Sequence, residues 1–319
     1  MDISVILCTY NRCESLAVAL ESLARLQMPP GISTEILVVD NNSNDDTRRV
    51  VETFAAKCPG RFRYLFEGRP GKSHALNSGI RESAAGILAF VDDDVTVEPS
   101  WLEELTSGLV NGDWEGAGGR ILPAWGDERP AWLPRTSPYA LAPLALFDLG
   151  PEAAQLNEPP FGTNMAFRKR VFEKYGGFRV DLGPRPTSEI RSEDTEFGRR
   201  VLNGGERLRY EPAAVVYHPV SENRLRKSYF LSWWFGKGRA NIREFGLRPD
   251  ARYHVAHVPM YLLRGLVVHG LRWLVCADSV SRFERKLTVW GKAGEVIECY
   301  RQPQHSIERI PSPHSFRAQ

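Results

Sequence analysis

Three consecutive aspartates, Asp92, Asp93 and Asp94, directly follow the apolar run at residues 87–91. Carboxylates placed so close together repel one another unless a cation or solvent relieves the charge. Mg²⁺ and Mn²⁺ prefer hard oxygen ligands and can bridge carboxylates to a diphosphate. The triplet therefore predicts a divalent metal site for a phosphorylated ligand, and a solvated acidic turn before the next helix is the simpler alternative.

A second acidic pair, Glu193-Asp194, follows Ser192 at the start of a helix predicted over residues 191–203. Acidic residues in a first turn interact favourably with the helix dipole, so the pair could have this local role alone. A carboxylate in a cleft can instead remove a proton from a hydroxyl group. His218, which follows the apolar run at 214–217, could add an imidazole ligand, although a lone histidine is more often structural.

The elements that must position these residues alternate in type along the chain. Runs rich in β-branched and apolar residues alternate with apolar residues at helical spacing, which predicts a parallel sheet with crossover helices. The predicted strands are 3–8, 35–39, 61–66 and 87–91, and the predicted helices are 14–26, 45–56 and 73–84. Ligands bind beyond the carboxyl ends of such strands. Asn11 and Asp40 fall there, although turns and helix caps also favour both residue types.

The rest of the chain is less regular. Residues 123–160 are rich in Pro, Gly and Trp and predict a long loop, followed by a strand at 161–168 and one or two strands at 207–217. Beyond about 220 the pattern becomes mostly helical, with basic residues among aromatic ones. We therefore predict a catalytic domain at 1–222, a helical region at 223–300 and a flexible tail at 301–319.

Several segments together resemble glycosyltransferase family 2. They are Val5-Ile6-Leu7-Cys8-Thr9-Tyr10-Asn11-Arg12, Glu35-Ile36-Leu37-Val38-Val39-Asp40-Asn41, Gly71-Lys72-Ser73-His74-Ala75-Leu76-Asn77, the Asp triplet, Gly162-Thr163-Asn164, Gly176-Gly177-Phe178, Ser192-Glu193-Asp194 and Tyr217-His218-Pro219. They occur in the order found in that family and cover roughly residues 3–219. Their combination is far more specific than any one segment.

The resemblance implies a GT-A fold: an α/β domain with a mixed, mainly parallel sheet flanked by helices, here with a mainly helical C-terminal extension. It implies an inverting transfer of sugar from a nucleoside diphosphate sugar, a UDP-sugar first of all, to a hydroxyl acceptor. Asp194 would be the general base and Glu193 would orient the acceptor or be the second choice of base. Asp94, Asp92 and His218 would hold Mn²⁺ or Mg²⁺. The donor would contact Thr9, Tyr10, Asn11, Arg12, Asp40, Asn42, Lys72, Asn77, Asp92 and Asp93.

Composition limits the other possibilities. A formal net charge of +2 argues against a generic polyanion binder, so no nucleic acid partner is expected. The five cysteines form no CxxC pair, and neither a disulfide framework nor a zinc site is indicated. Neither a signal peptide nor a spanning segment is visible, since Arg264 and Arg272 interrupt the most apolar stretch. We expect a cytoplasmic protein at the inner face of the cell membrane.

The acceptor is expected to be a glycan or lipid-linked glycan used in polysaccharide biosynthesis for the cell envelope. Basic and aromatic residues interleave between 224 and 239, which is typical of a membrane interface, so we expect peripheral membrane contact by the C-terminal region. Packing inside the region is the default role of Trp233 and Trp234. A metal-dependent nucleotidyltransferase is the alternative function, and a non-catalytic carbohydrate-binding protein is a third.

Overall fold

The computed structural model describes residues 2–27, 31–110, 112, 114–126, 129–134, 137–186, 188, 190–248 and 250–301. The predicted tail beyond Arg301 lies outside these residues. The chain divides into two compact units. The first is Met1–Gly126, Leu144–Pro186 and Glu193–Val220, and the second is Asp127–Pro143, Thr187–Ser192 and Ser221–Gln319.

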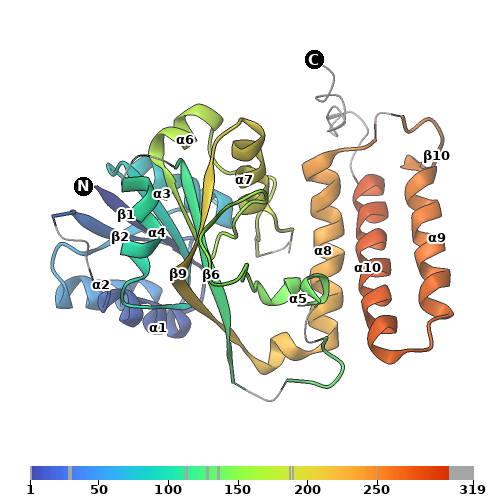
Figure 1. Ribbon diagram of the computed structural model, residues 1–319, viewed down its shortest axis with the longest axis horizontal. Helices are drawn as coiled ribbons and strands as arrows, with labels where there is room; N and C mark the ends of the chain where they lie inside the picture. The colour runs from blue at the N-terminus through green and yellow to red at the C-terminus, as the bar shows by residue number, and fades with distance from the viewer. Residues whose placement is uncertain are drawn as a thin grey trace. The chain divides into compact units, whose positions relative to one another are not determined.

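A twisted sheet forms the centre of the first unit (Figure 1). Within the described residues it has nine strands, eight of them in the order β3-β2-β1-β4-β8-β6-β9-β5, and β7 pairs with β9. Strands β1 (Ile3–Thr9), β2 (Thr34–Asp40), β3 (Phe62–Phe66) and β4 (Ile87–Asp92) are parallel. Strand β8 (Asn164–Arg168) runs antiparallel to β4 and to β6 (Gly116–Trp125). The others are β5 (Thr96–Val97), β7 (Ala154–Gln155) and β9 (Leu208–Val220).

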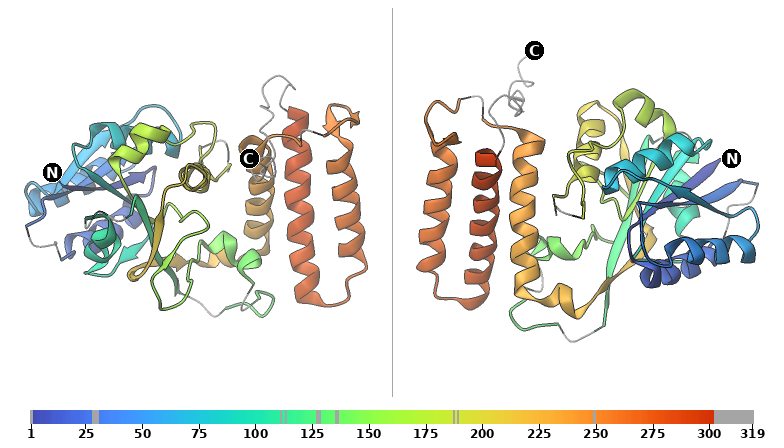
Figure 2. Two further views of the ribbon diagram at one scale, coloured as in Figure 1. Left: turned by 45° about the horizontal axis from the view of Figure 1, so that its top comes forward. Right: turned by 180° about the vertical axis from the view of Figure 1, so that it is seen from behind.

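Helices cover both faces of this sheet (Figure 2). One face packs against α1 (Cys13–Ala24), α2 (Thr47–Lys57) and α4 (Trp101–Val110). The other packs against α3 (Lys72–Glu82), α6 (Lys169–Tyr175) and α7 (Glu193–Asn203). Side chains of β1 alternate between the two cores, since Val5 and Leu7 enter the first and Ile6 enters the second. This alternation follows from the two-residue period of a strand.

The expected mixed, mainly parallel sheet with flanking helices is confirmed, and the first four strands and three helices lie where they were predicted. The predicted loop at 123–160 is wrong in part, because it contains the end of β6, α5 (Pro138–Leu141), a 3₁₀ turn at Ala142–Leu144 and β7. Strand β6 was missed because it begins Gly-Ala-Gly-Gly, a sequence with low β propensity. Only glycine fits at Gly119, where a Cβ would collide with the Ala214 carbonyl and the Asn164 side chain.

The second unit is mainly helical, as expected for the C-terminal extension. Helix α10 (Ser279–Arg301) lies between α8 (Lys227–Phe245) and α9 (Met260–Leu274) (Figures 1 and 2). A 3₁₀ turn at Glu222–Leu225 precedes α8, and the short strands β10 (His254–Val255) and β11 (Val258–Pro259) precede α9. In the described part of the chain, no helix combines the length and apolar character required to cross a bilayer.

Candidate active site

The carboxyl ends of three neighbouring parallel strands bring the predicted residues to one edge of the sheet. Thr9 at the end of β1 is in register with Asp40 at the end of β2, and Cys8 is in register with Asp92 at the end of β4. Thr9 and Asp40 are buried, whereas Tyr10 is partly exposed. The parallel arrangement therefore places these residues on the ligand-binding edge of an open α/β sheet.

Asp40 is held by two donors. Its Oδ2 accepts a hydrogen bond of 2.8 Å from the Tyr64 hydroxyl, and its Oδ1 accepts one of 2.8 Å from the Ser43 amide. The loops after β1 and β2 are joined, because the Asn11 amide donates to Ser43 Oγ and Asn11 Oδ1 accepts from the Asn44 amide. Asn11 has φ +51°, a left-handed conformation that asparagine tolerates better than most residues.

The sequence prediction did not include Tyr64, and it did not give the backbone conformation of Asn42. Tyr64 lies on β3, and its pKa is raised to about 12 by burial and by the hydrogen bond to Asp40. The phenol therefore remains a donor at neutral pH. Asn42 also has a positive φ, +67°, so the loop after β2 turns sharply at this predicted donor contact. No local signal in the sequence links Tyr64 to Asp40, 24 residues earlier.

The three aspartates of the triplet have different partners. Asp92 accepts from Lys72 Nζ at 2.5 Å and from Thr163 Oγ1 at 2.7 Å. Arg12 Nη1 donates to Asp93 at 3.1 Å and to Asp94 at 3.3 Å. Lys72 and Arg12 therefore offset much of the negative charge for which the sequence analysis predicted a metal ion.

Burial and neighbouring charges shift the pKa values of this group in opposite directions. Burial alone would raise the pKa of Asp92, but the Lys72 ammonium and the Thr163 hydroxyl hold it well below its usual range. Burial raises the pKa of Asp93 to about 6, although Arg12 opposes the rise. The pKa of Lys72 is raised because its carboxylate neighbours outweigh the effect of burial. Asp92 and Lys72 thus form a charged pair at neutral pH.

Asp94 and His218 are the residues best suited to a divalent ion. His218 is buried at the end of β9, and its Nε2 lies 3.9 Å from Asp94 Oδ1. Neighbouring donors on one octahedral ion are about 3 Å apart and opposite donors about 4 Å apart, so a small movement of either side chain would let one ion bind both. Among the described residues, no three His, Cys, Asp or Glu side chains converge as a metal cluster. Two protein ligands suit Mg²⁺ or Mn²⁺, which commonly complete their shell with phosphate and water oxygens.

The acidic pair at the start of α7 lies near the same lysine. Glu193 is buried with its Oε1 3.7 Å from Lys72 Nζ, the ammonium that binds Asp92. Asp194 is only partly buried, and its Oδ2 accepts from the Gly162 amide at 2.7 Å. The Thr195 amide donates to Asp194 Oδ1 at 2.7 Å. The start of α7 and the end of β4 therefore meet around Lys72.

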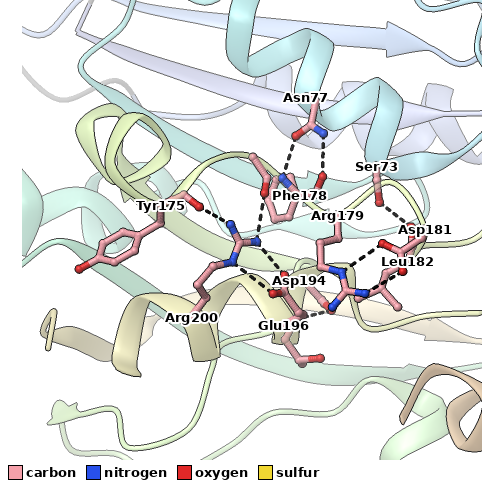
Figure 3. Close-up of polar contacts among 12 residues, drawn as sticks. Ser73, Asn77, Tyr175, Phe178, Arg179, Asp181, Leu182, Asp194, Glu196 and Arg200 are labelled. Atoms are coloured by element: carbon pink, nitrogen blue, oxygen red, sulfur yellow. Dashed lines mark hydrogen bonds and ion pairs between the residues drawn. The ribbon is translucent and has the colours of Figure 1, made fainter. Parts of the chain in front are cut away.

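The segment that leads from α6 towards α7 is fixed by polar contacts from both sides (Figure 3). Asn77 of α3 faces the Phe178 backbone, where its Nδ2 donates to the carbonyl and its Oδ1 accepts from the amide, both at 2.8 Å. Arg200 of α7 donates to the Tyr175 carbonyl and to Glu196. The Asn77 side-chain amide therefore holds this loop. The expected contact between Asn77 and the nucleotide sugar stays a prediction.

Comparison with known proteins identifies the family. The sequence profile described as Glycosyl transferase family 2 matches residues 4–176. The chain belongs to glycosyl transferase family 2. The matched range contains β1 to β4, the aspartate triplet and Thr163. This assignment makes the chain an enzyme of the glycosyltransferase class and gives no support to the alternative of a nucleotidyltransferase.

Relatives of this glycosyltransferase extend the similarity over most of its length. Glucosyl-dolichyl phosphate glucuronosyltransferase of Haloferax volcanii is 27% identical over 296 residues, which cover 91% of this chain and 92% of that protein. Succinoglycan biosynthesis protein ExoM of Rhizobium meliloti is 26% identical over 244 residues, 76% of this chain and 75% of that protein. The similarity to the H. volcanii protein thus continues past the profile match, which ends at residue 176, through the segment that contains Glu193 and Asp194.

A solved structure supports the fold of this family 2 glycosyltransferase. Mannosyltransferase PcManGT from Pyrobaculum calidifontis, in complex with GDP-Man and Mn²⁺, matches with a TM-score of 0.60 and 16% identity. The match covers 92% of this chain and 86% of that one. The predicted GT-A fold is therefore confirmed.

Glu193 should destabilise this glycosyltransferase above neutral pH. Burial and the nearby Asp194 raise its pKa to about 7, although Lys72 opposes the rise. The pKa of this carboxyl group in the unfolded chain is near 4.5. Its protonation therefore stabilises the fold fully below about pH 4.5, and this contribution is lost as the pH rises through 7. We expect the Tm of Glu193→Gln to exceed that of the unchanged enzyme by an amount that grows between pH 4.5 and 7, reaching about 2–5 °C.

Thermal denaturation from pH 4.5 to 8.5 measures this difference. Glu196→Gln is the matched control, because it removes a carboxylate from the same first turn of α7. A Glu193→Gln advantage that is equal at pH 4.5 and pH 8 would contradict the predicted titration.

Proposed function

We propose that this glycosyltransferase transfers a sugar from a nucleoside diphosphate sugar, a UDP-sugar in the first instance, to a hydroxyl acceptor with inversion at the anomeric carbon. One observation carries the proposal: Lys72 Nζ lies 2.5 Å from Asp92 and 3.7 Å from Glu193. The strand end suited to the donor and the helix start suited to the acceptor are therefore neighbours. Inversion requires such a pair of groups around the sugar, one for the leaving diphosphate and one for the incoming hydroxyl.

The nucleoside would bind over the ends of β1 and β2. Asp40 can accept a hydrogen bond from an N–H of the base, since its carboxylate is fixed by Tyr64 and Ser43. Thr9, Tyr10, Asn11 and Asn42 would line the same site, and Arg12, Asp92 and Asp93 would follow towards the ribose and diphosphate. The complexes of S. aureus TarS with UDP-GlcNAc and of PcManGT with GDP-Man support nucleotide sugars as a donor class.

Asp94 and His218 would hold Mn²⁺ or Mg²⁺, with Asp92 as a third candidate ligand whose carboxylate also binds Lys72. A divalent ion bound there would neutralise charge on the departing diphosphate. Lys72 and Arg12 add fixed positive charge to the same region. The Mn²⁺ complexes of PcManGT and GalNAc-T7 support this choice of metal.

Asp194 would act as the general base. It is only partly buried, and the Gly162 and Thr195 amides fix its carboxylate, so a hydroxyl can approach an oriented proton acceptor. The acceptor oxygen would form a bond to the anomeric carbon as the bond to the diphosphate oxygen breaks, and its proton would pass to Asp194. Buried Glu193 would orient the acceptor. The names of the H. volcanii and R. meliloti relatives support a glycan or lipid-linked glycan as the acceptor.

The donor assignment is tested with UDP-, GDP- and dTDP-sugars in the presence of Mn²⁺. We expect a UDP-sugar to raise the Tm and to be hydrolysed slowly without acceptor. Asp40→Ala should weaken nucleotide affinity by about tenfold or more, because a charged group's hydrogen bond is lost. The control is Glu21→Ala on the exposed face of α1. If no nucleotide sugar stabilises the enzyme, or if Asp40→Ala binds it as well as the control does, the donor site is misplaced.

A further inference from the structure

Helix α9 turns an apolar side to solvent. Met260, Val267, Leu271 and Leu274 are 46%, 61%, 58% and 60% exposed. At 100° per residue these four fall within an arc of about 60° on the helix, so they form one stripe. Val275, directly after the helix, is 80% exposed and lies beside it. The reverse arrangement, with polar residues outward, is normal for a helix on the surface of a soluble domain.

The helix is fixed in this orientation by its opposite side. Leu262 is buried and belongs to a small core with Ile242 of α8, Val258 of β11 and Cys299 of α10. A rotation of α9 that hid the exposed stripe would remove Leu262 from this core. The exposed stripe is therefore a property of the folded unit, and contiguous apolar surface of this kind marks an interaction site.

The charged side chains in the segment that carries this stripe are all of one sign. Between Ala251 and Ala277 the chain has three arginines, Arg252, Arg264 and Arg272, and no Asp or Glu. Arg264 is exposed on the same side of the helix as Met260 and Leu271. An apolar stripe with cationic residues beside it suits an anionic lipid surface, where the arginines meet headgroups and the apolar side chains enter the acyl boundary.

We infer that α9 lies in the headgroup layer of an anionic bilayer, with the stripe of Met260, Val267, Leu271 and Leu274 facing the acyl chains. A second copy of this chain is a poorer occupant, because self-pairing of the stripe would enclose the Arg264 side chain of each copy in an apolar interface. The helix has 15 residues, about 22 Å, and lies along the surface. The sequence analysis placed membrane contact at residues 224–239, whereas this inference places it on α9. In the structure, the Trp234 ring stacks on the Tyr139 ring inside the second unit, with 3.9 Å between the ring centroids.

Vesicle co-sedimentation of the full chain tests this inference. We expect binding to phosphatidylglycerol vesicles at low salt and at least tenfold weaker binding to phosphatidylcholine vesicles. The triple variant Val267→Ser, Leu271→Ser, Leu274→Ser should lower the partition coefficient at least tenfold, and Arg264→Gln with Arg272→Gln should remove the preference for anionic lipid. The control is Val18→Ser, an exposed valine on α1.

Donor hydrolysis without vesicles and the Tm separate a lost surface from a lost fold. Both should be unchanged in the triple variant, because the stripe lies outside the catalytic residues. The inference is overturned if the unchanged enzyme ignores anionic vesicles, or if the triple variant folds and binds them equally well. A dimer that the triple variant converts to monomer, without vesicle binding, would assign the stripe to self-association instead. None of these outcomes depends on which sugar is transferred.

Discussion

Asp194→Asn should reduce the rate of glycosyl transfer by about 10²–10⁴ and leave donor affinity nearly unchanged. The amide has the shape of the carboxylate but cannot accept a proton from an attacking hydroxyl. Asp92, Asp94 and Lys72, which would contact the donor, are not touched by the substitution. The expected signature is a fall in kcat with little change in the donor KM, measured with saturating acceptor.

A structural effect must be separated from this chemical one. The Gly162 and Thr195 amides both donate to the Asp194 carboxylate, and an asparagine can accept only one of these hydrogen bonds. Asp194→Asn could therefore loosen the first turn of α7. Glu196→Gln, which disturbs the ion pair with Arg200 in the same turn, reports how much such loosening costs. An equal loss of activity in both variants would mean that Asp194 is structural.

Glu193 provides the competing assignment of the base. It is buried and close to Lys72, and the proposed chemistry gives it an orienting role. Glu193→Gln should then raise the acceptor KM more than it lowers kcat. If Glu193→Gln abolishes transfer while Asp194→Asn retains it, the base is Glu193.

Much of the first unit could be predicted because its signals are local. Strands β1, β2 and β4 contain continuous apolar runs, and α1 to α3 have apolar residues at helical spacing, so their recognition does not depend on distant contacts. Parallel pairing then places the strand ends, with Thr9, Asp40 and Asp92, at one edge. The position of these candidate residues thus follows from the sequence with few further assumptions.

The partners of the site residues could not be predicted, since they come from distant parts of the chain. Thr163 binds Asp92 across 71 positions, and the Gly162 amide binds Asp194 across 32. Gly162 is also constrained by space, because a Cβ there would lie 3.1 Å from the Asp194 side chain. Such requirements arise from tertiary packing and leave no periodic pattern in the sequence.

The aspartate triplet shows that charge density alone does not identify the partner of each carboxylate. Three adjacent carboxylates suggest one metal site, but successive residues at a strand end point in different directions. Lys72 binds Asp92, and Arg12 binds Asp93 and Asp94. Asp94 Oδ1 lies 3.9 Å from the Nε2 atom of His218, so we favour this pair among the predicted ligands, and coordination by Asp92 stays a prediction.

Asp94→Ala is therefore expected to lower metal-dependent transfer by about 10³, with a smaller loss for His218→Ala. Removing the carboxylate takes away the anionic member of the pair, while Asp93 still binds Arg12 and keeps the loop after β4 in place. The direct measurement is Mn²⁺ affinity in the presence of UDP, followed by electron paramagnetic resonance. Both variants should bind Mn²⁺ at least tenfold more weakly than the unchanged enzyme.

Chelation provides the matching test on the unchanged enzyme, in which EDTA should stop transfer and added Mn²⁺ should restore it. Glu52→Ala is the control, because Glu52 pairs with Arg48 on the exposed side of α2. Asp93→Asn provides a second comparison, since it removes a neighbouring charge without touching the Asp94 and His218 pair. If Asp93→Asn weakens Mn²⁺ binding more than Asp94→Ala does, then Mn²⁺ affinity depends on Arg12 and on the overall charge, and the assignment of Asp94 as a metal ligand is wrong.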